Sequence, residues 1–556
     1  MQTQFTKYLL SWLVAAAVLH AEVKIDFVCF KKVYPSDPGT IHIFLNNKGE
    51  QEARIARLVL NEKEVEEGEK TDDVFWWTQV PNTILPGKSG ILMIKTARPL
   101  ALPVKVRIVL NTGDTLEETL HSLTPEFFRI ASVSFDLNQN KIYVYLENKF
   151  PNRTVEIKDI LIDGRNVRTQ IIKRLGSVIL PGEKDFFICK GLKTIVPGQY
   201  ITIKITTEEG FVTGALARAY SYFPIQDFGG DKRKELFFNE DTFDMHFPGD
   251  EKKFNEYRKE PSYKVYHLLD DPVCSDERKG YLGAMAREVI TRRKTCYEKD
   301  SGHPTLIYIC EYSKPLGYFV YGELADVIAV DPYELTFYNN PPEKDGEYVA
   351  IARRASAPRP VVAIPEAFRC ISPKFPVGSK RFPTPEEERL LVYSEIAAGA
   401  KGLWYYVSYG QNGYKNNPEL EKEIGRINRE IQFLRDFLVV GEPMDIVKTD
   451  SQSVKADALF CGDRGIVIIL RNGDYRTIKD KENDGWKTIV ENPGKISITL
   501  NLPGNFPFSI ESIKALGKEG KEVVLVRKDM LRKKVVIEKE MTEIAEPILV
   551  KFREEK

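Results

Sequence analysis

Residues 263–273 read YKVYHLLDDPV, an apolar run that ends in two adjacent aspartates and a proline. A short, almost continuous apolar run is typical of a strand in a parallel sheet that is covered on both faces. Asp270 and Asp271 stand where this strand ends, because Pro272 cannot continue a central strand. We consider two roles for the aspartates: a turn, for which Asp is well suited, or part of an active site.

Six similar runs surround this one, and segments of helical pattern lie between several of them. The runs are AYSYFPI (219–225), TFDMHF (242–247), TLIYIC (305–310), DVIAVD (326–331), PVVAIP (360–365) and GLWYYV (402–407). Helical periodicity extends over 275–294, 384–402 and 417–441. The alternation predicts that residues 217–441 form an α/β domain, either a TIM-type (β/α)8 barrel or an open parallel sheet.

The first half of this domain is short for a barrel. Four strands would have to fit between about 217 and 270, whereas a complete barrel needs about 250 residues spread evenly along the chain. We therefore expect an incomplete or distorted barrel in which residues 223–247 replace missing elements. The polar residues of that segment, Asp227, Asp244 and His246, could then enter the site.

The segments on either side of the α/β domain have β character. TIHIFLNNKG (40–49) and ILPGKSGILMI (84–94) recur as KIYVYLENKF (141–150) and ILPGEKDFFI (179–188), about one immunoglobulin-sized unit later. We predict two tandem Ig-like β-sandwiches, residues 22–125 and 126–216. Strands separated by NG and PG turns predict a further β-sandwich over 442–556, which would brace the barrel.

Trp76 and Trp77 are adjacent on a predicted strand of the first sandwich. Neighbouring residues of a strand point to opposite faces. We therefore expect one tryptophan in the core and the other either against the next domain or exposed to a sugar, with domain packing preferred.

The composition and the N-terminus limit the class of protein. The 556-residue chain has 80 acidic and 80 basic residues, so its formal net charge is zero. A nucleic-acid-binding protein needs a basic excess or a basic face, and we expect no such partner. Residues 1–21 place Lys7 before a short apolar core, which predicts a signal peptide and an exported protein, with an uncleaved anchor as the alternative. No later segment is apolar enough to span a membrane.

The seven cysteines show no CxxC pair and no zinc-type spacing with histidine. Cys274 and Cys296 flank the helix predicted over 275–294, which would hold them about 30 Å apart at 1.5 Å per residue. The acidic residues also lack the loop spacing of an EF-hand. We predict structural cysteines, no metal site and no cofactor.

Carboxylates and aromatic residues gather at the ends of the predicted strands, where a parallel barrel carries its reactive groups. They are Asp270, Asp271, Glu311, Asp331, Tyr333, Glu366, Trp404 and Tyr406. His267, inside its strand, is expected to line the barrel and not to bind a metal. Carboxylates beside aromatic platforms, without a nucleophilic Ser or Cys motif, fit glycoside hydrolysis: one carboxylic acid protonates the leaving oxygen, and a second carboxylate attacks or activates water.

At these strand ends the domain resembles the (β/α)8 glycoside hydrolases of clan A, especially multidomain members with β-sandwiches before and after the barrel. Such proteins carry Asn-Glu-Pro at the end of strand four and a Glu nucleophile at the end of strand seven. Asp270-Asp271-Pro272 stands where Asn-Glu-Pro is expected, and Glu366 ends the strand that then counts as the seventh. The resemblance implies Asp271 as acid/base and Glu366 as nucleophile or base. It further implies an oligo- or polysaccharide held by Asp270, His267, Asp331, Tyr333, Trp404 and Tyr406.

Two departures from that family favour a second hypothesis. Asp271 replaces Glu, which moves the proton donor by about one methylene, and a misplacement of about 1 Å can lower a rate ~100-fold. The compressed half-barrel is the other departure. A non-catalytic glycan-binding or cell-surface scaffold protein with a degenerate barrel would show both. Structural roles also remain open: turns at Asp271 and Asp331, an ion pair between Glu366 and Arg369, and core packing for Trp404.

Overall fold

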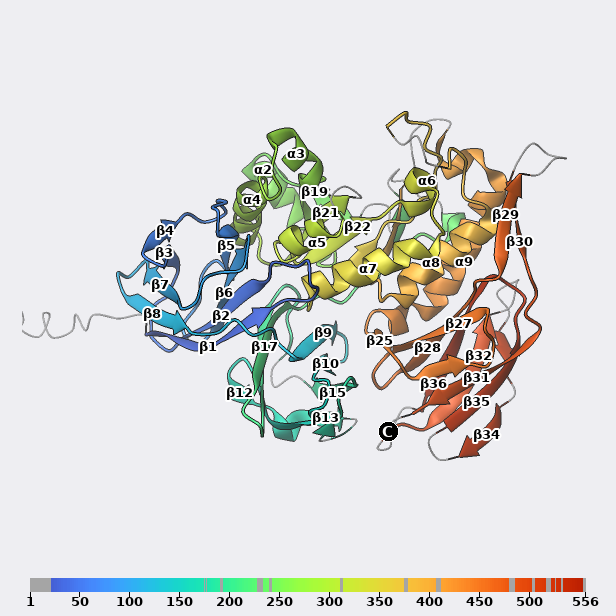
Figure 1. Ribbon diagram of the computed structural model, residues 1–556, viewed down its shortest axis with the longest axis horizontal. Coiled ribbons are helices and arrows are strands. Elements are labelled where there is room, and N and C mark those ends of the chain that lie inside the picture. Colours follow the sequence, from blue (N-terminus) through green and yellow to red (C-terminus); the bar gives the residue numbers. More distant parts are fainter. Residues whose placement is uncertain are drawn as a thin grey trace, which may run out of the picture.

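The computed structural model describes residues 22–553, with gaps at 175, 177, 191–193, 228–233, 240–242, 311–313, 375–378, 407–411, 480–485, 503–505, 517–521, 526 and 532–533. The predicted signal peptide (1–21) and Glu311 therefore lie outside the described residues. Within the described ranges, no helix is both long and apolar enough to cross a membrane. Figure 1 shows β-rich modules at the two ends of the chain, in blue and red, on either side of a domain that holds the helices.

Each N-terminal module consists of two antiparallel sheets that share one core. The first has the orders β1 (Val23–Lys31), β2 (Thr40–Asn47), β6 (Ser89–Thr96), β5 (Val74–Val80) and β4 (Lys63–Val65), β3 (Ile55–Leu60), β7 (Val104–Leu110), β8 (Thr115–Leu120). The second has the orders β13 (Ile171–Arg174), β15 (Lys184–Lys190), β10 (Lys141–Asn148), β9 (Phe128–Asp136) and β12 (Arg165–Asn166), β11 (Val155–Ile162), β16 (Tyr200–Thr207), β17 (Val212–Arg218), with β14 (Val178–Ile179) on β11. Inward residues such as Ile43 and Ile108 close the first sandwich, and Val144 and Ile203 the second.

The two modules also repeat one local structure. Asn47 ends β2, Asn148 ends β10, and both side chains are fully buried. Each amide nitrogen donates to two backbone carbonyls, one in the following loop and one in the ILPG segment, at 2.7–2.9 Å. Each amide oxygen accepts the N–H of the residue two positions further on. The same asparagine therefore closes the same loop in both modules, which gives the sequence repeat a physical cause.

A seven-stranded parallel sheet forms the centre of the α/β domain. Its order is β18 (Ile225–Asp227), β24 (Leu403–Tyr405), β23 (Val361–Ala363), β22 (Val327–Asp331), β21 (Thr305–Cys310), β20 (Val265–Leu269), β19 (Asp244–His246). The first strand pairs with the last, as in a closed barrel, but β18 and β19 are not paired in the described part of the sheet. Side chains link these edges: the Gln226 amide oxygen accepts the N–H of Phe243, and the ring of Phe243 packs against Tyr222 and Trp404. Among the described residues, the sheet is a partial barrel of seven strands.

Among the described residues, β18, β19, a 3₁₀ turn and the helix α2 (Glu251–Tyr257) lie between the second sandwich and the strand that holds YKVYHLL. The unpaired place in the sheet is the one between β18 and β19. Counted back from β24 as the eighth strand, β23 is the seventh and β20 the fourth, as the resemblance implied.

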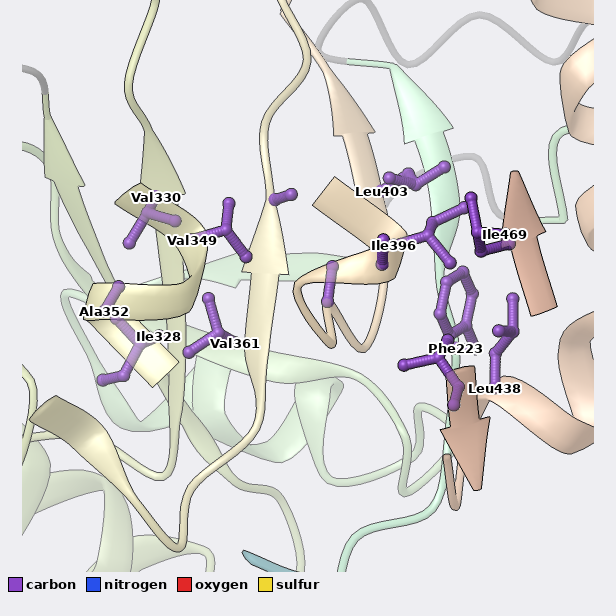
Figure 2. Close-up of a cluster of buried hydrophobic side chains, with 14 of the residues drawn as sticks. Phe223, Ile328, Val330, Val349, Ala352, Val361, Ile396, Leu403, Leu438 and Ile469 are labelled. Carbon is purple, nitrogen blue, oxygen red and sulfur yellow. The ribbon is translucent and has the colours of Figure 1, made fainter. Parts of the chain in front are cut away.

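Helices cover the outer face of the sheet. Their bounds are α3 (Pro272–Lys279), α4 (Ala286–Lys299), α5 (Leu316–Tyr321), α6 (Glu334–Tyr338), α7 (Glu343–Ser356), α8 (Pro385–Ala397) and α9 (Pro418–Leu438). Alternate strand residues point outward into this layer: Ile328 and Val330 of β22 share a buried cluster with Val349 of α7, as Figure 2 shows. The other residues of each strand point into the barrel.

The single helix predicted over 275–294 is wrong, because the segment forms two helices. α3 ends at Lys279, where Gly280 takes a left-handed φ of +82°, and α4 begins at Ala286. The Asp276 carboxylate holds the connection by accepting the N–H groups of Gly283 and Met285 at 2.7 and 3.0 Å. The apolar spacing on which the prediction rested continues through this turn. The helix itself is interrupted, because Gly280 and Gly283 both take left-handed φ angles here.

The C-terminal module packs against α8 and α9. Its sheets have the orders β25 (Glu442–Met444), β27 (Val454–Phe460), β28 (Gly465–Asn472), β36 (Ala545–Phe552), β32 (Ile510–Leu516), β33 (Glu522–Val524) and β26 (Val447–Thr449), β31 (Lys495–Asn501), β35 (Lys534–Glu540), β34 (Arg527–Leu531), beside a ribbon of β29 (Tyr475–Lys479) and β30 (Trp486–Val490). α8 is buried on all sides because Ile469 of β28 covers the helix near Ile396 (Figure 2). Asn472, at the end of β28, bonds to its loop in the manner of Asn47 and Asn148.

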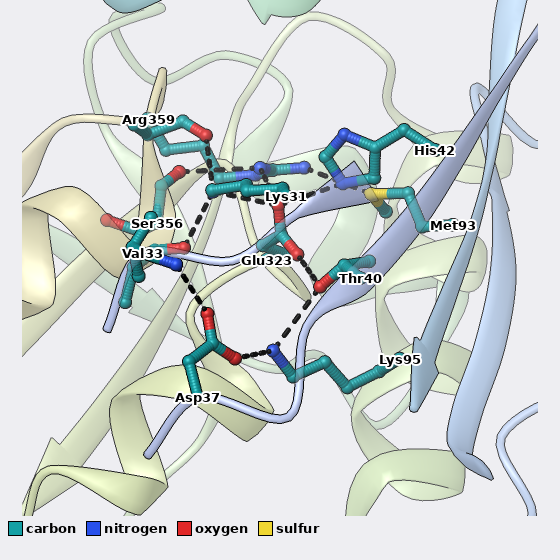
Figure 3. A network of polar contacts seen from close by, with 12 residues as sticks. Lys31, Val33, Asp37, Thr40, His42, Met93, Lys95, Glu323, Ser356 and Arg359 are labelled. Atoms are coloured by element: carbon teal, nitrogen blue, oxygen red, sulfur yellow. Dashed lines mark hydrogen bonds and ion pairs between the residues drawn. The ribbon is translucent and has the colours of Figure 1, made fainter. Parts of the chain in front are cut away.

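The first sandwich seals the end of the barrel where the strands begin. Glu323 precedes β22 there, and Lys31 Nζ lies 3.0 Å from its Oε1 while the Thr40 hydroxyl donates to its Oε2 at 2.7 Å (Figure 3). Burial raises the pKa of Glu323, but the charges of Lys31 and His42 outweigh it and hold that pKa well below its ordinary value. This end of a barrel ordinarily serves stability.

Trp76 and Trp77 point to opposite faces of β5, as predicted. The Trp77 indole donates to the carbonyl of Val65 inside the sandwich, at 2.7 Å. The Trp76 indole donates to the carbonyl of Val320 in the α/β domain, also at 2.7 Å. Trp76 is therefore an anchor between domains and has no face free for a sugar, since it is fully buried.

Candidate functional site at the barrel mouth

The C-terminal ends of the barrel strands, which we call the mouth, carry the polar groups predicted for the site. Below them the interior is filled by inward side chains such as Val265, Leu306, Val327 and Val362. The barrel is a packed core and not a pore, as in other barrels of this type. Chemistry is therefore confined to the residues at the mouth.

The exit of β20 brings His267, Asp270 and Asp271 together. His267 lies on the inward face, and its ring packs edge-on against Tyr308 with the ring centroids 4.2 Å apart. The pairing of β20 with β21 is irregular just after His267, and such irregularities re-aim the residues that follow. Asp270 is exposed, whereas Asp271 is partly buried.

Asp271 has a left-handed backbone, with φ +43° and ψ 64°, at the N-cap of α3. Its side chain makes no capping hydrogen bond to the helix, so the carboxyl group is not explained by turn formation. Burial and the charge of Asp270 raise the pKa of Asp271 to about 7, although the Cys310 thiol and His267 act in the opposite direction. A carboxyl group with such a pKa is partly protonated at neutral pH and can donate a proton.

A second strained residue, Tyr333, stands at the exit of β22. Its φ is +48°, which is a genuine outlier for a bulky side chain. Its ring lies 5.3 Å from that of Phe368 and 5.6 Å from that of Tyr406. Tyr406 is partly exposed, whereas Tyr333 and the neighbouring Asp331 are buried. This corner offers two partly exposed aromatic side chains among the described residues, Tyr406 and Phe337.

Glu366 is fully buried behind this corner. Its Oε1 accepts the N–H of Leu335 at 2.8 Å, and its Oε2 accepts the N–H of Thr336 at 2.7 Å. These are free N–H groups of the first turn of α6, which need an acceptor. The ion pair with Arg369 that we considered is not formed, since the Arg369 Nε donates to Asn412. Glu366 holds the segment that carries Tyr333, and its carboxylate does not reach a cleft.

Glu366 belongs to a row of buried carboxyl groups between β23, α7 and α8. Asp345, Glu366, Glu388 and Glu395 are all fully buried. Within the described part of the chain, no hydrogen-bond partner reaches either oxygen of Glu388 or Glu395. Burial raises the pKa of Glu366 to about 7 and, with the charge of Glu366, that of Glu388 to about 8. The same causes raise the pKa values of Asp345 and Glu395 well above their ordinary range.

The predicted site therefore divides into separate groups. His267, Asp270 and Asp271 lie together, and Tyr333 and Tyr406 lie together, but no contact between described residues joins Asp271 to Glu366. Trp404 is 3% exposed and packs against Tyr308, with centroids 5.0 Å apart, so core packing describes it better than a sugar platform. Asp227 is buried and accepts the Tyr414 hydroxyl at 2.9 Å. Asp244 and His246 do reach the mouth, on β19.

The sequence did not single out Tyr308, Cys274 or Cys310 as mouth residues. Burial, and then the charges of Asp244, Asp270 and Asp271, raise the pKa of Tyr308 well above its ordinary value. The sulfur atoms of Cys274 and Cys310 are 3.2 Å apart. The sequence did contain a signal for Tyr308: alternate residues of β21 point into the barrel, and Tyr308 is one of them. The cysteine contact follows from the pairing of β20 with β21, because α3 begins directly after β20 and Cys310 ends β21.

A separate cleft lies far from the mouth, with an open volume of about 910 Å³. It is bounded by the second sandwich, the C-terminal end of α9 and the C-terminal sandwich. Phe508 and Phe552 stack there with centroids 5.0 Å apart and planes at 7°. Charged residues of both signs, including Arg435, Asp463 and Arg464, line the rest.

Comparison with known proteins gives distant structural likeness and no family. No family model matches the sequence, and neither does any curated protein. A cycloisomaltooligosaccharide glucanotransferase from Paenibacillus sp. is similar at 9% identity and a TM-score of 0.38, over 76% of this chain and 99% of that one. A glycoside hydrolase of family 5 from Bacteroides vulgatus is similar at 12% identity and a TM-score of 0.33, over 54% and 67%.

A β-glucuronidase from Bacteroides uniformis is similar at 9% identity over 94% of this chain and 80% of that one, with a TM-score of 0.25. At such identities and TM-scores, the likenesses define neither a family nor an activity for this chain. The residues at the barrel mouth are therefore the basis for the function proposed below.

Proposed function

We propose that the barrel mouth binds a saccharide and hydrolyses its glycosidic bond, with Asp271 as the proton donor. The observation that carries the proposal is the strained backbone at two strand exits, Asp271 and Tyr333. Left-handed conformations of residues other than glycine cost about 1–3 kcal/mol and cluster at functional sites. Here they aim a carboxyl group and an aromatic corner at the same end of the barrel.

The environment of Asp271 supports the role of proton donor. A general acid in glycoside hydrolysis must be protonated when the leaving oxygen needs a proton. Burial and the adjacent Asp270 provide that condition by raising the pKa of Asp271 to about 7. Asp270 is exposed and is the second carboxylate in this proposal.

Glu366 takes no chemical part in the proposed reaction, which revises the role that the resemblance implied. Its two carboxylate oxygens are used by backbone N–H groups of α6. It acts as a positioning residue for Tyr333. The protein is proposed to work outside the cell, on the strength of the N-terminal 21 residues alone.

The test is a screen of aryl glycosides and oligosaccharides with the mature protein and three variants. Asp271→Asn should lower kcat at least ~100-fold, the lower end of what general acid catalysis contributes, without loss of binding. Glu277→Gln, on the exposed face of α3, is the matched control and should leave turnover unchanged. Glu366→Gln should change Tm more than kcat. Full turnover by Asp271→Asn would refute the assignment.

A non-catalytic glycan-binding function is the second candidate, and the sealed Glu366 favours it. If the mouth lacks a carboxylate pair of the predicted kind, it does not hydrolyse a glycosidic bond. The protein would then bind glycans without cleaving them. The cleft that contains the partly exposed Phe508 is then the place for a sugar ring. In that case no substrate is turned over, and Phe508→Ala weakens glycan binding while Asp271→Asn does not.

A further inference from the structure

Three side chains of metal-ligating type converge at the edge of the mouth: Asp244, His246 and His267. We propose that they form a binding site for a divalent transition-metal ion. The carboxylate oxygens and imidazole nitrogens of the three residues all lie within 4.8 Å of one another. The proposal concerns these three residues alone and does not depend on whether Asp271 cleaves glycosides.

The pairing of two parallel strands accounts for the convergence. Asp244 and His246 are two positions apart on β19, so their side chains leave the same face of the strand. His246 stands directly opposite His267 of β20 in the strand register. The neighbouring His267 is on the inward face and packs on Tyr308. A pair of residues from one strand and a single residue from the next thus face one another.

The spacing suits ligands of one ion. Asp244 Oδ2 lies 3.3 Å from His267 Nδ1. Two ligand atoms bound about 2.1 Å from the same metal, at angles between octahedral and tetrahedral, are separated by about 3.0–3.4 Å. The measured distance falls in this interval, and the rings of His246 and His267 have centroids only 5.7 Å apart.

A second buried histidine shows what a structural His–Asp pair looks like in this protein. His303 Nδ1 is 2.7 Å from Asp300 Oδ2, and its Nε2 is 3.0 Å from the carbonyl of Glu260, so both ring nitrogens are satisfied. The His267 side chain is only 10% exposed, yet its Nε2 has no hydrogen-bond partner among the described residues. Buried polar atoms are ordinarily paired. The His267 ring therefore lacks the second anchor that fixes His303, and its Nδ1, which faces Asp244, is the nitrogen that the ion proposed here would bind.

The donor set selects the class of ion. Two imidazoles and one carboxylate suit zinc, iron or another first-row transition metal, whereas calcium and magnesium prefer oxygen ligands alone. Three protein ligands leave at least one coordination position for water or a ligand, as in catalytic zinc sites. His246 is exposed, so that position is open to solvent. The site is therefore of the kind that binds an exchangeable ligand.

Zinc titration of the chelator-treated protein, made without a histidine tag, tests the proposal. Isothermal titration calorimetry should give one high-affinity Zn²⁺ per chain, and Co²⁺ should give a visible d–d absorption band. Substituting a residue that only orients a metal ligand weakens metal affinity 10–100-fold. Replacing a ligand itself, as in His246→Gln or His267→Gln, should weaken Zn²⁺ binding at least about 100-fold. Because His246 is exposed, its variant should fold normally.

Two control variants exclude other sites. His121→Gln removes an exposed histidine of the first sandwich and should leave Zn²⁺ affinity unchanged. Cys274→Ser removes a ligand from a second set, Asp271, Cys274 and Cys310, whose atoms also lie within 4.8 Å of one another, and should likewise change nothing. No zinc binding by the parent protein would overturn the proposal. So would zinc binding that survives His246→Gln, or that is lost in Cys274→Ser.

Discussion

Two groups of carboxylates stand on the same barrel, and they differ in what surrounds them. At the exit of β20, Asp270 is exposed and Asp271 is partly buried, within reach of an incoming ligand. Between β23 and the helices α7 and α8, the row of Asp345, Glu366, Glu388 and Glu395 has no exposed surface. Asp271 at the mouth and Glu388 in the buried row both have raised pKa values. A raised pKa therefore marks burial in both places, and access to a ligand in only one.

The largest expected difference between the two groups is in how stability depends on pH. In the unfolded chain Glu366 and Glu388 have an ordinary pKa of 4.5, and in the folded protein their pKa values are about 7 and 8. The folded state thus binds more protons above pH 4.5. The contribution of these two groups to stability is therefore greatest below that pH and falls as pH rises, by about 1.4 kcal/mol per unit for each group up to its folded pKa.

Urea denaturation at a series of pH values measures this slope. From pH 5 to 7 the free energy of unfolding should fall by roughly 4 kcal/mol, since two or more groups contribute over that range. Glu388→Gln should flatten the slope by about 1.4 kcal/mol per pH unit, whereas Glu277→Gln, on the exposed face of α3, should leave it unchanged. A slope that is the same in Glu388→Gln and the parent protein would contradict the raised pKa of Glu388.

Removal of Glu366 should have the next largest effect. Glu366→Ala leaves the N–H groups of Leu335 and Thr336 buried without an acceptor. Each orphaned group costs about 1–3 kcal/mol, so we expect a loss of roughly 3 kcal/mol in the free energy of unfolding. Glu366→Gln keeps one acceptor oxygen and should lose less. Equal stability of the alanine variant and the parent would show that α6 does not need this acceptor.

The smallest effect concerns the backbone of Asp271. Asn adopts the left-handed conformation nearly as readily as Asp, whereas Ala does not. Asp271→Ala should therefore be about 1 kcal/mol less stable than Asp271→Asn, and both should lack the proton donor. Thermal denaturation of the two variants, side by side, measures the difference. If Asp271→Ala is the more stable of the two, backbone strain does not distinguish this position.

The sequence predicted the strands of the barrel better than the roles of the residues at their ends. Apolar runs located six of the seven described strands, β19 to β24, because a strand covered on both faces must be apolar throughout. The run predicted at 219–225 meets the short β18 only at Ile225, since Gln226 and Asp227 are polar. The role of Glu366 could not be read from its neighbours in the chain, because the N–H groups that it accepts are about 30 positions away.

The two histidines at the mouth show the same limit. His246 and His267 are 21 positions apart, far from any familiar metal-ligand spacing, and only the pairing of β19 with β20 sets them opposite each other. In the same way, Cys274 meets Cys310 because α3 begins directly after β20, whose neighbour β21 ends at Cys310. Contacts between strands depend on register, and register is not visible in local sequence.

The ion pair beneath the barrel has a consequence for how the chain can be divided. Glu323 is fully buried, and its cationic partner Lys31 comes from the first sandwich. A barrel produced without that sandwich would expose Glu323 to water, with Arg359 of the barrel still 4.0 Å from its carboxylate, and would also expose the surface that Trp76 covers. We therefore expect a barrel that is cut from the first sandwich at the predicted boundary to be less stable than the whole chain.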